Sequence, residues 1–299
     1  MRRRLKAGRS FDLLSSYSWY TPGWLGLLGF VAVFLVGALI GSIAGVVMVK
    51  MEQDGTLAPG TFLTYGNVIV YPLMFIPAMI YASAISRARR NRVAACPLDD
   101  GRFEPLGGFV TAVVASASMI TLQFALDPIS SALPEMNEST RTALEALLKG
   151  PLWVSVLCAC IFAPFFEEWL CRGIILRSLL KKCHPAIAIV ISAVFFGLIH
   201  GNIWQAIPAF VLGCWMGWVY WRTGSLKLTM LMHCVNNTFS TIMSRIPSLE
   251  DYDNISDMIE SVPVYAAVVA GCLVATVGFA LALAKIKSQP EEDLEIVQE

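Results

Sequence analysis

Long apolar runs separated by short polar segments dominate the pattern of this chain. About 20 residues of α-helix are needed to cross ~30 Å of bilayer hydrocarbon. Eight runs reach or approach that length, and the fifth, which ends in His-Gly-Asn, is the shortest. The pattern predicts an all-α protein, a polytopic transmembrane helix bundle of about eight spans. The expected spans are residues 24–49, 62–86, 107–126, 152–176, 186–201, 203–221, 226–243 and 263–284.

The composition agrees with a membrane protein. Of the 299 residues, 56% are hydrophobic and 15% are charged, whereas soluble domains average about 25% charged residues. The first apolar run is too long for a cleaved signal peptide. The loops leave little room for a second domain, so we expect residues 1–299 to form a single membrane-embedded domain. Residues 139–150 could form a short amphipathic helix on the membrane surface, and the acidic tail, about 288–299, is expected to be disordered.

Charge orients the predicted bundle. With eight spans, both termini lie on the same side, and placing that side in the cytoplasm puts 17 of the 22 lysines and arginines there. This distribution follows the positive-inside rule and predicts that both termini are cytoplasmic. The net charge of zero hides the asymmetry. Topology explains the basic loops, so the partner we expect is the lipid bilayer, with no nucleic acid.

Ionisable side chains interrupt one apolar segment, PLWVSVLCACIFAPFFEEWLCRGIILRSLL, which contains Glu167, Glu168 and Arg172. A charged group near the bilayer centre costs roughly 3 kcal/mol on insertion scales, and such residues usually mark function. Two of the three histidines, His200 and His233, also lie in predicted spans. Either histidine alone could be a core residue that bonds to a carbonyl group, but their coincidence with a glutamate pair argues for a site.

Helical spacing assigns the acidic and basic groups to faces. Glu168 and Arg172 are four residues apart, so they share a face with the acid toward the N-terminus. A guanidinium group can hold a carboxylate with two parallel hydrogen bonds, and we expect this arrangement for the pair. Glu167 points about 100° away, so it can face a different group or a water molecule.

Two further pairs have the same spacing. His233 and Asn237 share a face of one predicted helix, and Phe196 and His200 share a face of another. Three helices therefore offer a carboxylate, an imidazole and an imidazole–amide pair. These groups are sufficient to activate water and to stabilise an oxyanion.

The motifs Glu167-Glu168-x-x-x-Arg172, Phe196-x-x-x-His200 and His233-x-x-x-Asn237 resemble the signature of a known family. This is the CPBP (CAAX protease and bacteriocin-processing, or Abi) family of intramembrane endopeptidases. The order, the spacing and the placement on late spans all match. The resemblance covers about residues 150–240, the motif-bearing core, and the first three spans contribute no motif.

The resemblance implies an endopeptidase that acts on a membrane-associated peptide or protein. Glu167 would be the general base that activates water, while His200, His233 and Asn237 would polarise the scissile carbonyl and stabilise the oxyanion. Glu168 and Arg172 would support them structurally. Family members have been described both as metal-dependent and as glutamate-type proteases. We favour chemistry without a cofactor; if zinc is present, His200, His233 and Glu167 would be its ligands.

Other readings remain open. A regulator or immunity scaffold without catalytic activity could use the same fold, and a proton-coupled transporter could use the glutamates and histidines as a relay. The eight cysteines form no CxxC pair, so no disulfide or cysteine–metal framework is expected. We expect a multi-pass protein of a bacterial plasma membrane, with the endoplasmic reticulum membrane as the alternative.

Overall fold

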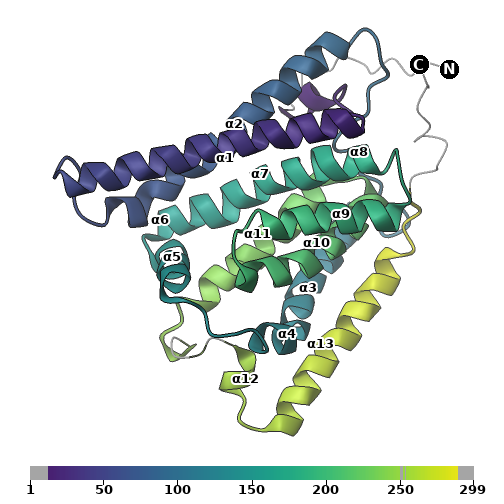
Figure 1. Ribbon diagram of the computed structural model, residues 1–299. Coiled ribbons are helices and arrows are strands. Elements are labelled where there is room, and N and C mark those ends of the chain that lie inside the picture. Colours follow the sequence, from purple (N-terminus) through teal and green to yellow (C-terminus); the bar gives the residue numbers. More distant parts are fainter. Residues whose placement is uncertain (1–12, 250–251, 253, 289–299) are drawn as a thin grey trace.

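The computed structural model describes residues 13–249, 252 and 254–288, and every regular element within them is a helix (Figure 1). The predicted acidic tail lies outside the described residues apart from Ser288. The all-α prediction is confirmed. In chain order the elements are η1 (Leu13–Tyr17), α1 (Trp24–Gln53), α2 (Thr61–Arg89), α3 (Gly108–Ala125), α4 (Asp127–Ser131), α5 (Glu138–Lys149), α6 (Leu152–Ser155), η2 (Val156–Phe162), α7 (Ala163–Glu168), η3 (Trp169–Leu176), α8 (Arg177–Leu179), α9 (Pro185–Leu198), α10 (Ile203–Thr223), α11 (Leu226–Met243), η4 (Pro247–Leu249), α12 (Ile255–Met258) and α13 (Val262–Leu283).

All eight predicted spans are helical, but they are not equivalent. Six helical segments of the described chain are long and apolar enough to cross a membrane. The helix α9 has only 14 residues, a length of about 21 Å, and α11 falls outside those six. The multi-pass character therefore stands, while the count of eight and the cytoplasmic termini stay predictions.

The segment from α6 to α8 forms one continuous rod through the middle of the bundle (Figure 1). Its elements η2 and η3 are π-helical, with α-helical turns between and beyond them. Within its most apolar window 72% of the residues are buried, against 11% in α13. Short π-helical stretches occur frequently at functional sites. The predicted motif with the two glutamates lies on this central rod.

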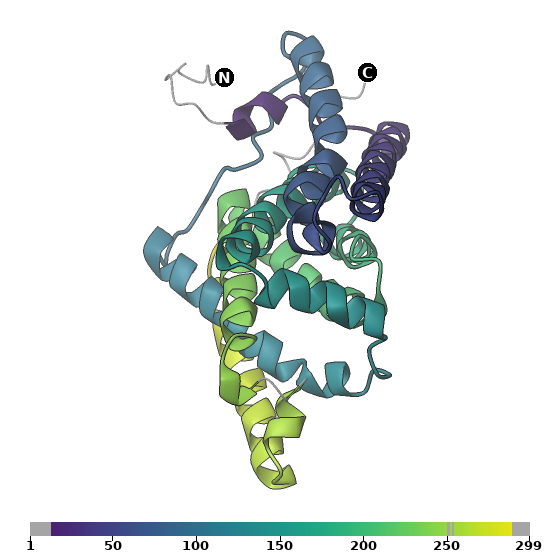
Figure 2. The ribbon, with the colours of Figure 1, turned by 90° about the vertical axis from the view of Figure 1, so that its left-hand side faces the viewer.

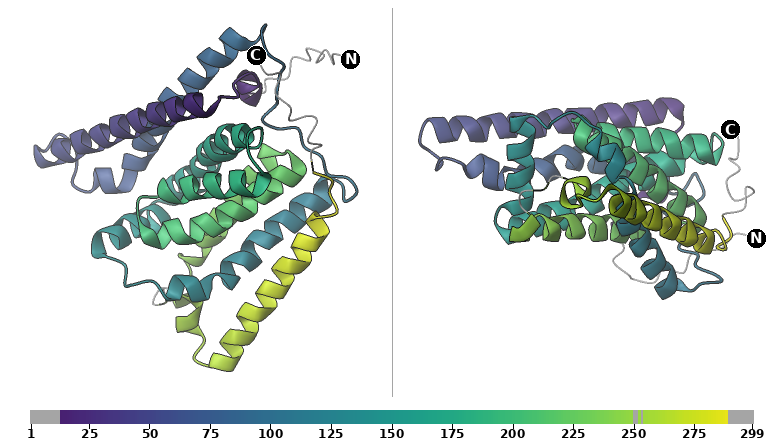
Figure 3. Two further views of the ribbon diagram at one scale, coloured as in Figure 1. Left: turned by 45° about the vertical axis from the view of Figure 1, so that its right-hand side comes forward. Right: turned by 90° about the horizontal axis from the view of Figure 1, so that it is seen from below.

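Other helices surround the rod. Figure 3 shows the α1–α2 hairpin on one side of it and the α3–α13 pair on the other. Glycines let the hairpin close tightly, because a Cβ atom at Gly37 would lie 2.2 Å from the carbonyl oxygen of Met74. Figure 2 gives the view at right angles, in which α11 lies beside the rod. The central position of the rod brings side chains from several helices to the two glutamates.

Candidate active site

Glu167 is buried on α7, with 7% of its surface exposed. Its Oε1 atom accepts a hydrogen bond from the hydroxyl group of Tyr71, which reaches across from α2. Its Oε2 atom lies 4.0 Å from Nε2 of His233 and accepts no hydrogen bond from the described protein atoms. The carboxylate is thus positioned by one neighbour, while its second oxygen keeps its capacity to accept a proton.

Glu168 and Arg172 form the predicted pair on the shared face. Both side chains are fully buried, and Arg172 donates to Glu168 through a hydrogen bond of 2.7 Å. The expectation of two parallel hydrogen bonds from Arg172 to Glu168 is wrong. The second terminal nitrogen of Arg172 donates instead to the carbonyl oxygen of Gly213 at 2.9 Å. The guanidinium also lies 4.4 Å from the ring centre of Phe196, a distance within cation–π range. Arg172 therefore joins the rod to both α9 and α10.

Gly213 makes this contact possible. A Cβ atom at that position would lie 3.1 Å from the Phe196 ring and 3.2 Å from Ala193. Gly217, one turn further along α10, has a similarly close neighbour in Ile189 at 3.2 Å. The two glycines let α9 and α10 approach closely, as expected of a GxxxG pattern, and they leave the Gly213 carbonyl within reach of Arg172.

His233 on α11 connects the two glutamates. Its Nδ1 atom lies 3.1 Å from Oε1 of Glu168. Because an ionised carboxylate can only accept hydrogen bonds, Nδ1 carries the proton in this contact. That arrangement turns Nε2 toward Glu167. Glu168 thus fixes both the tautomer and the orientation of the His233 ring, as carboxylates commonly do for functional histidines.

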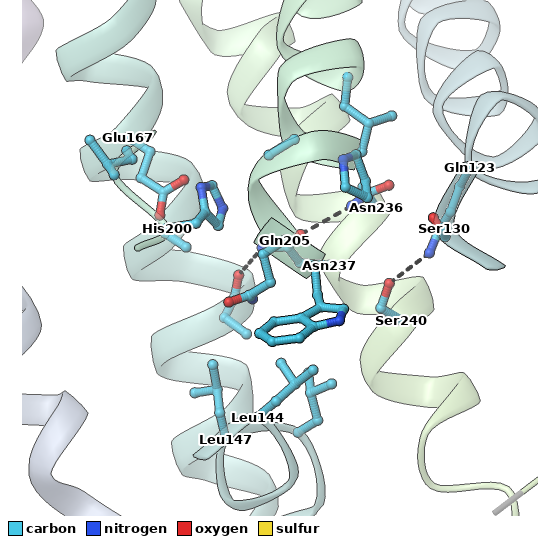
Figure 4. A pocket seen from close by; sticks show the side chains of 18 of the residues that line it. Gln123, Ser130, Leu144, Leu147, Glu167, His200, Gln205, Asn236, Asn237 and Ser240 are labelled. Atoms are coloured by element: carbon cyan, nitrogen blue, oxygen red, sulfur yellow. Dashed lines mark hydrogen bonds between the residues drawn. The ribbon is translucent and has the colours of Figure 1, made fainter. Parts of the chain in front are cut away.

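His200 follows the end of α9. Its Nδ1 atom donates to the carbonyl oxygen of Phe196 at 2.9 Å, since a carbonyl group can only accept, and Nε2 is left available. The helix α9 ends at Leu198, and the residues that follow it, Ile199 and His200, line the cavity. Figure 4 shows the side chains of Glu167 and His200 pointing toward one another.

Asn237 lies one turn beyond His233. Its Nδ2 atom donates to the carbonyl oxygen of Ala159 at 2.8 Å, and its Oδ1 atom accepts from Asn236 at 3.2 Å. A primary amide has two N–H groups, so one of those of Asn237 remains for another acceptor. The neighbouring side chains hold the amide in one orientation.

These groups line a cavity of about 1000 Å³. The predicted residues Glu167, His200, His233 and Asn237 all contribute to its wall, as does Tyr71. Glu168 and Arg172 do not line it; they lie behind it and contact His233 and α10. The two adjacent glutamates therefore have different surroundings, one at the cavity and one in the packed interior.

A zinc site was the open alternative for these residues. Over the part of the chain that the structure describes, no three His, Cys, Asp or Glu side chains come together as a metal site. All eight cysteines are free thiols. Whether the site holds zinc stays a prediction, and the mechanism proposed below routes no chemical step through a metal.

Sequence reasoning missed several polar residues in the cavity wall. Tyr71 and Gln123 belong to early spans, which carry no family motif, and Asn236 and Ser240 lie on α11. Gln123 donates to Ser240 at 3.0 Å, as Figure 4 shows. The available signal was a tyrosine and a glutamine inside otherwise apolar runs, but nothing in the sequence linked either of them to Glu167 or to α11.

Comparison with known proteins agrees with the motifs. Residues 149–239 match a family model described as Type II CAAX prenyl endopeptidase Rce1-like. A Bacillus subtilis (strain 168) protein with the name "Putative membrane peptidase YdiL" is 30% identical over 111 residues. That alignment covers 37% of this chain and 45% of the relative, so the chain spans less than half of the relative's length. No solved structure matches. The family resemblance predicted from the motifs is confirmed over this segment.

Proposed function

We propose that this protein is an intramembrane endopeptidase that hydrolyses a peptide bond with water activated by Glu167. The observation that supports this best is the surroundings of Glu167. It is a buried carboxylate at a cavity, positioned by Tyr71 and lying close to an imidazole that a second carboxylate orients. The family match over residues 149–239 and the name of the Bacillus subtilis relative point to the same activity.

The proposed reaction begins with a water molecule between Glu167 and the scissile carbonyl carbon. Glu167 takes a proton from the water while the oxygen forms a bond to that carbon. The remaining N–H of Asn237 would stabilise the oxyanion, together with Nε2–H of His200 as an imidazolium ion, which carries a proton on both ring nitrogens. The C–N bond then breaks, and the proton passes from Glu167 to the leaving nitrogen, directly or through His233. Water supplies every added atom, so the step balances without a cofactor.

Glu168 and Arg172 act through His233 and take no part in the proton transfer. Glu168 holds the Nδ1–H group of His233, and Arg172 compensates the buried charge of Glu168. Removal of Glu168 would leave the His233 ring free to rotate, so Nε2 would no longer be held toward Glu167. We therefore assign Glu167 as the base and Glu168 as a positioning residue.

The test is peptide cleavage by purified protein in lipid vesicles. A synthetic peptide mixture of random sequence is incubated in water enriched in ¹⁸O, and new C-termini are identified by mass spectrometry. We expect ¹⁸O in the new carboxyl groups with the wild-type protein and near-complete loss of cleavage with Glu167→Gln. Glu260→Gln, at an exposed position outside the cavity, is the matched control and should retain cleavage. Cleavage at a near-normal rate by Glu167→Gln would refute the assignment.

We favour the plasma membrane of a bacterium, with a membrane-associated peptide or protein as the substrate. Fractionation of cells that produce the protein, with detection in the plasma-membrane fraction, would test the location independently of catalysis.

A further inference from the structure

The cavity extends to one end of the bundle, where exposed residues of the connecting loops line it. Its wall at that end includes Pro134 and Glu135 from the α4–α5 loop, Gln205 at the start of α10, and Asp257 on α12. Three of these four residues, Pro134, Glu135 and Asp257, are exposed. The connections at this end are joined to one another, since the Trp204 indole donates to the Pro134 carbonyl at 2.7 Å. We call this end the mouth.

The helix α5 forms part of the mouth. The structure confirms the short amphipathic helix predicted there, from Glu138 to Lys149. Its apolar residues Leu144, Leu147 and Leu148 line the cavity, and Figure 4 shows the first two below the polar groups of the site. The apolar face of α5 is thus directed at least partly to the cavity, so a molecule that enters passes beside this helix.

The opposite end of the bundle is densely packed. Beyond Glu168 the rod continues through Trp169, Ile174 and Leu176, each of which is fully buried. Arg177 then donates to the carbonyl oxygens of Cys96 and Tyr20. No residue at this end lines the described cavity.

The packed end is also the basic end. Backbone bonds join the chain after α2 to the α10–α11 loop, from Asp100 to Gly224 at 2.9 Å and from Arg102 to Thr223 at 2.8 Å. Arg222 donates to carbonyl oxygens just beyond α13. Within the described residues this end has 12 lysines and arginines and the mouth end has four. Those at the basic end are Arg87, Arg89, Arg90, Arg92, Arg102, Arg177, Lys181, Lys182, Arg222, Lys227, Lys285 and Lys287; those at the mouth end are Lys50, Arg141, Lys149 and Arg245.

Cytoplasmic loops of membrane proteins carry the excess of lysine and arginine. We infer that the cavity opens on the extracytoplasmic face of the membrane, and that its substrate is an extended polypeptide segment that arrives from that face. The substrate part of the inference rests on the proposed function, whereas the direction of the opening does not. An exported peptide or an outer segment of a membrane-bound polypeptide has this chemistry and location; a lipid-modified tail in the cytoplasm does not.

Cysteine labelling tests the direction without any need for catalysis. Ala132→Cys places a thiol in the exposed loop at the mouth, and Ala94→Cys places the same group in an exposed loop at the basic end. In right-side-out membrane vesicles, a membrane-impermeant polyethylene glycol maleimide should shift the gel band of Ala132→Cys. It should shift that of Ala94→Cys only after permeabilisation. The wild-type protein gives the background of the native cysteines.

The opposite labelling pattern would overturn the inference. Thr142→Cys, at an exposed position on α5, repeats the test if the first thiol proves unreactive in detergent as well. A second experiment presents the random peptide mixture to one side of vesicles of known orientation. Cleavage should occur only with peptide at the outer side, and cleavage only from the inner side would refute the inference. Absence of cleavage from both sides would refute the proposed function and leave the labelling result as it stands.

Discussion

Arg172 offers the sharpest test of how the two glutamates are distinguished. Its guanidinium makes a 2.7 Å bond to Glu168 and a 2.9 Å bond to the Gly213 carbonyl, and it lies over Phe196. Arg172→Ala removes all three contacts and leaves the carboxylate of Glu168 buried without its cation, although His233 still contacts it. We expect both stability and activity to fall.

The magnitude follows from the burial of the pair. Breaking a fully buried ion pair by removing one partner costs about 3–5 kcal/mol. An unsatisfied buried carbonyl group costs about 1–3 kcal/mol, but such contributions overlap, so we take about 3–5 kcal/mol as the expected loss. Arg172→Lys keeps the charge without the planar fork. Lysine cannot serve both Glu168 and Gly213 in the same geometry, so we expect a partial rescue.

A double-mutant cycle with Glu168→Gln, Arg172→Gln and their combination isolates the pair. The assay is reversible unfolding in mixed detergent micelles, followed by tryptophan fluorescence, for each variant. We expect a coupling energy of about 0.5–3 kcal/mol, with the double variant more stable than the sum of the two single losses predicts. Glu145 and Lys149 have the same spacing on α5 but are partly exposed, and the matched cycle there should give below about 1 kcal/mol.

Strict additivity at Glu168 and Arg172 would refute the partnership. The structural support for Glu168 as a positioning residue would then be lost, and Glu168 would become the better candidate for the general base. Activity measurements on the same variants separate the two roles, because Glu167→Gln should abolish cleavage with little change in unfolding free energy.

Three further predictions concern the cavity. Tyr71→Phe removes the hydrogen bond to Glu167. We expect slower cleavage and a shifted pH–rate profile, with a fold that is unchanged by circular dichroism. An unaltered pH–rate profile would exclude a role for the Tyr71 hydroxyl group in catalysis. Asn237→Ala should lower the turnover number about 100- to 1000-fold, measured in single-turnover cleavage, and a change in KM alone would contradict an oxyanion role. Incubation with a chelator should leave cleavage intact and elemental analysis should find substoichiometric zinc; stoichiometric zinc that is lost in His200→Ala would overturn the metal-free mechanism.

Much of the architecture could be predicted from local pattern. Apolar runs of sufficient length form helices whatever surrounds them, because a backbone in hydrocarbon must satisfy its own hydrogen bonds. The fourfold spacing placed Glu168 beside Arg172, since residues four apart stack on a helix face. The same rule separated Glu167 from its neighbour, and the structure places the two glutamates in different surroundings as expected.

The tertiary structure decided what lies between helices. Tyr71 is 96 residues from Glu167 in the chain and Gly213 is 41 from Arg172, and no local periodicity encodes either contact. Both depend on how helices pack; for Gly213, the absence of a side chain lets α9 and α10 approach closely. His200 lines the cavity just beyond the end of α9 at Leu198, and none of the described residues at the basic end lines the cavity. Sequence alone determined the helices and the groups that they carry; only the packing of those helices determined which groups meet and which residues line the cavity.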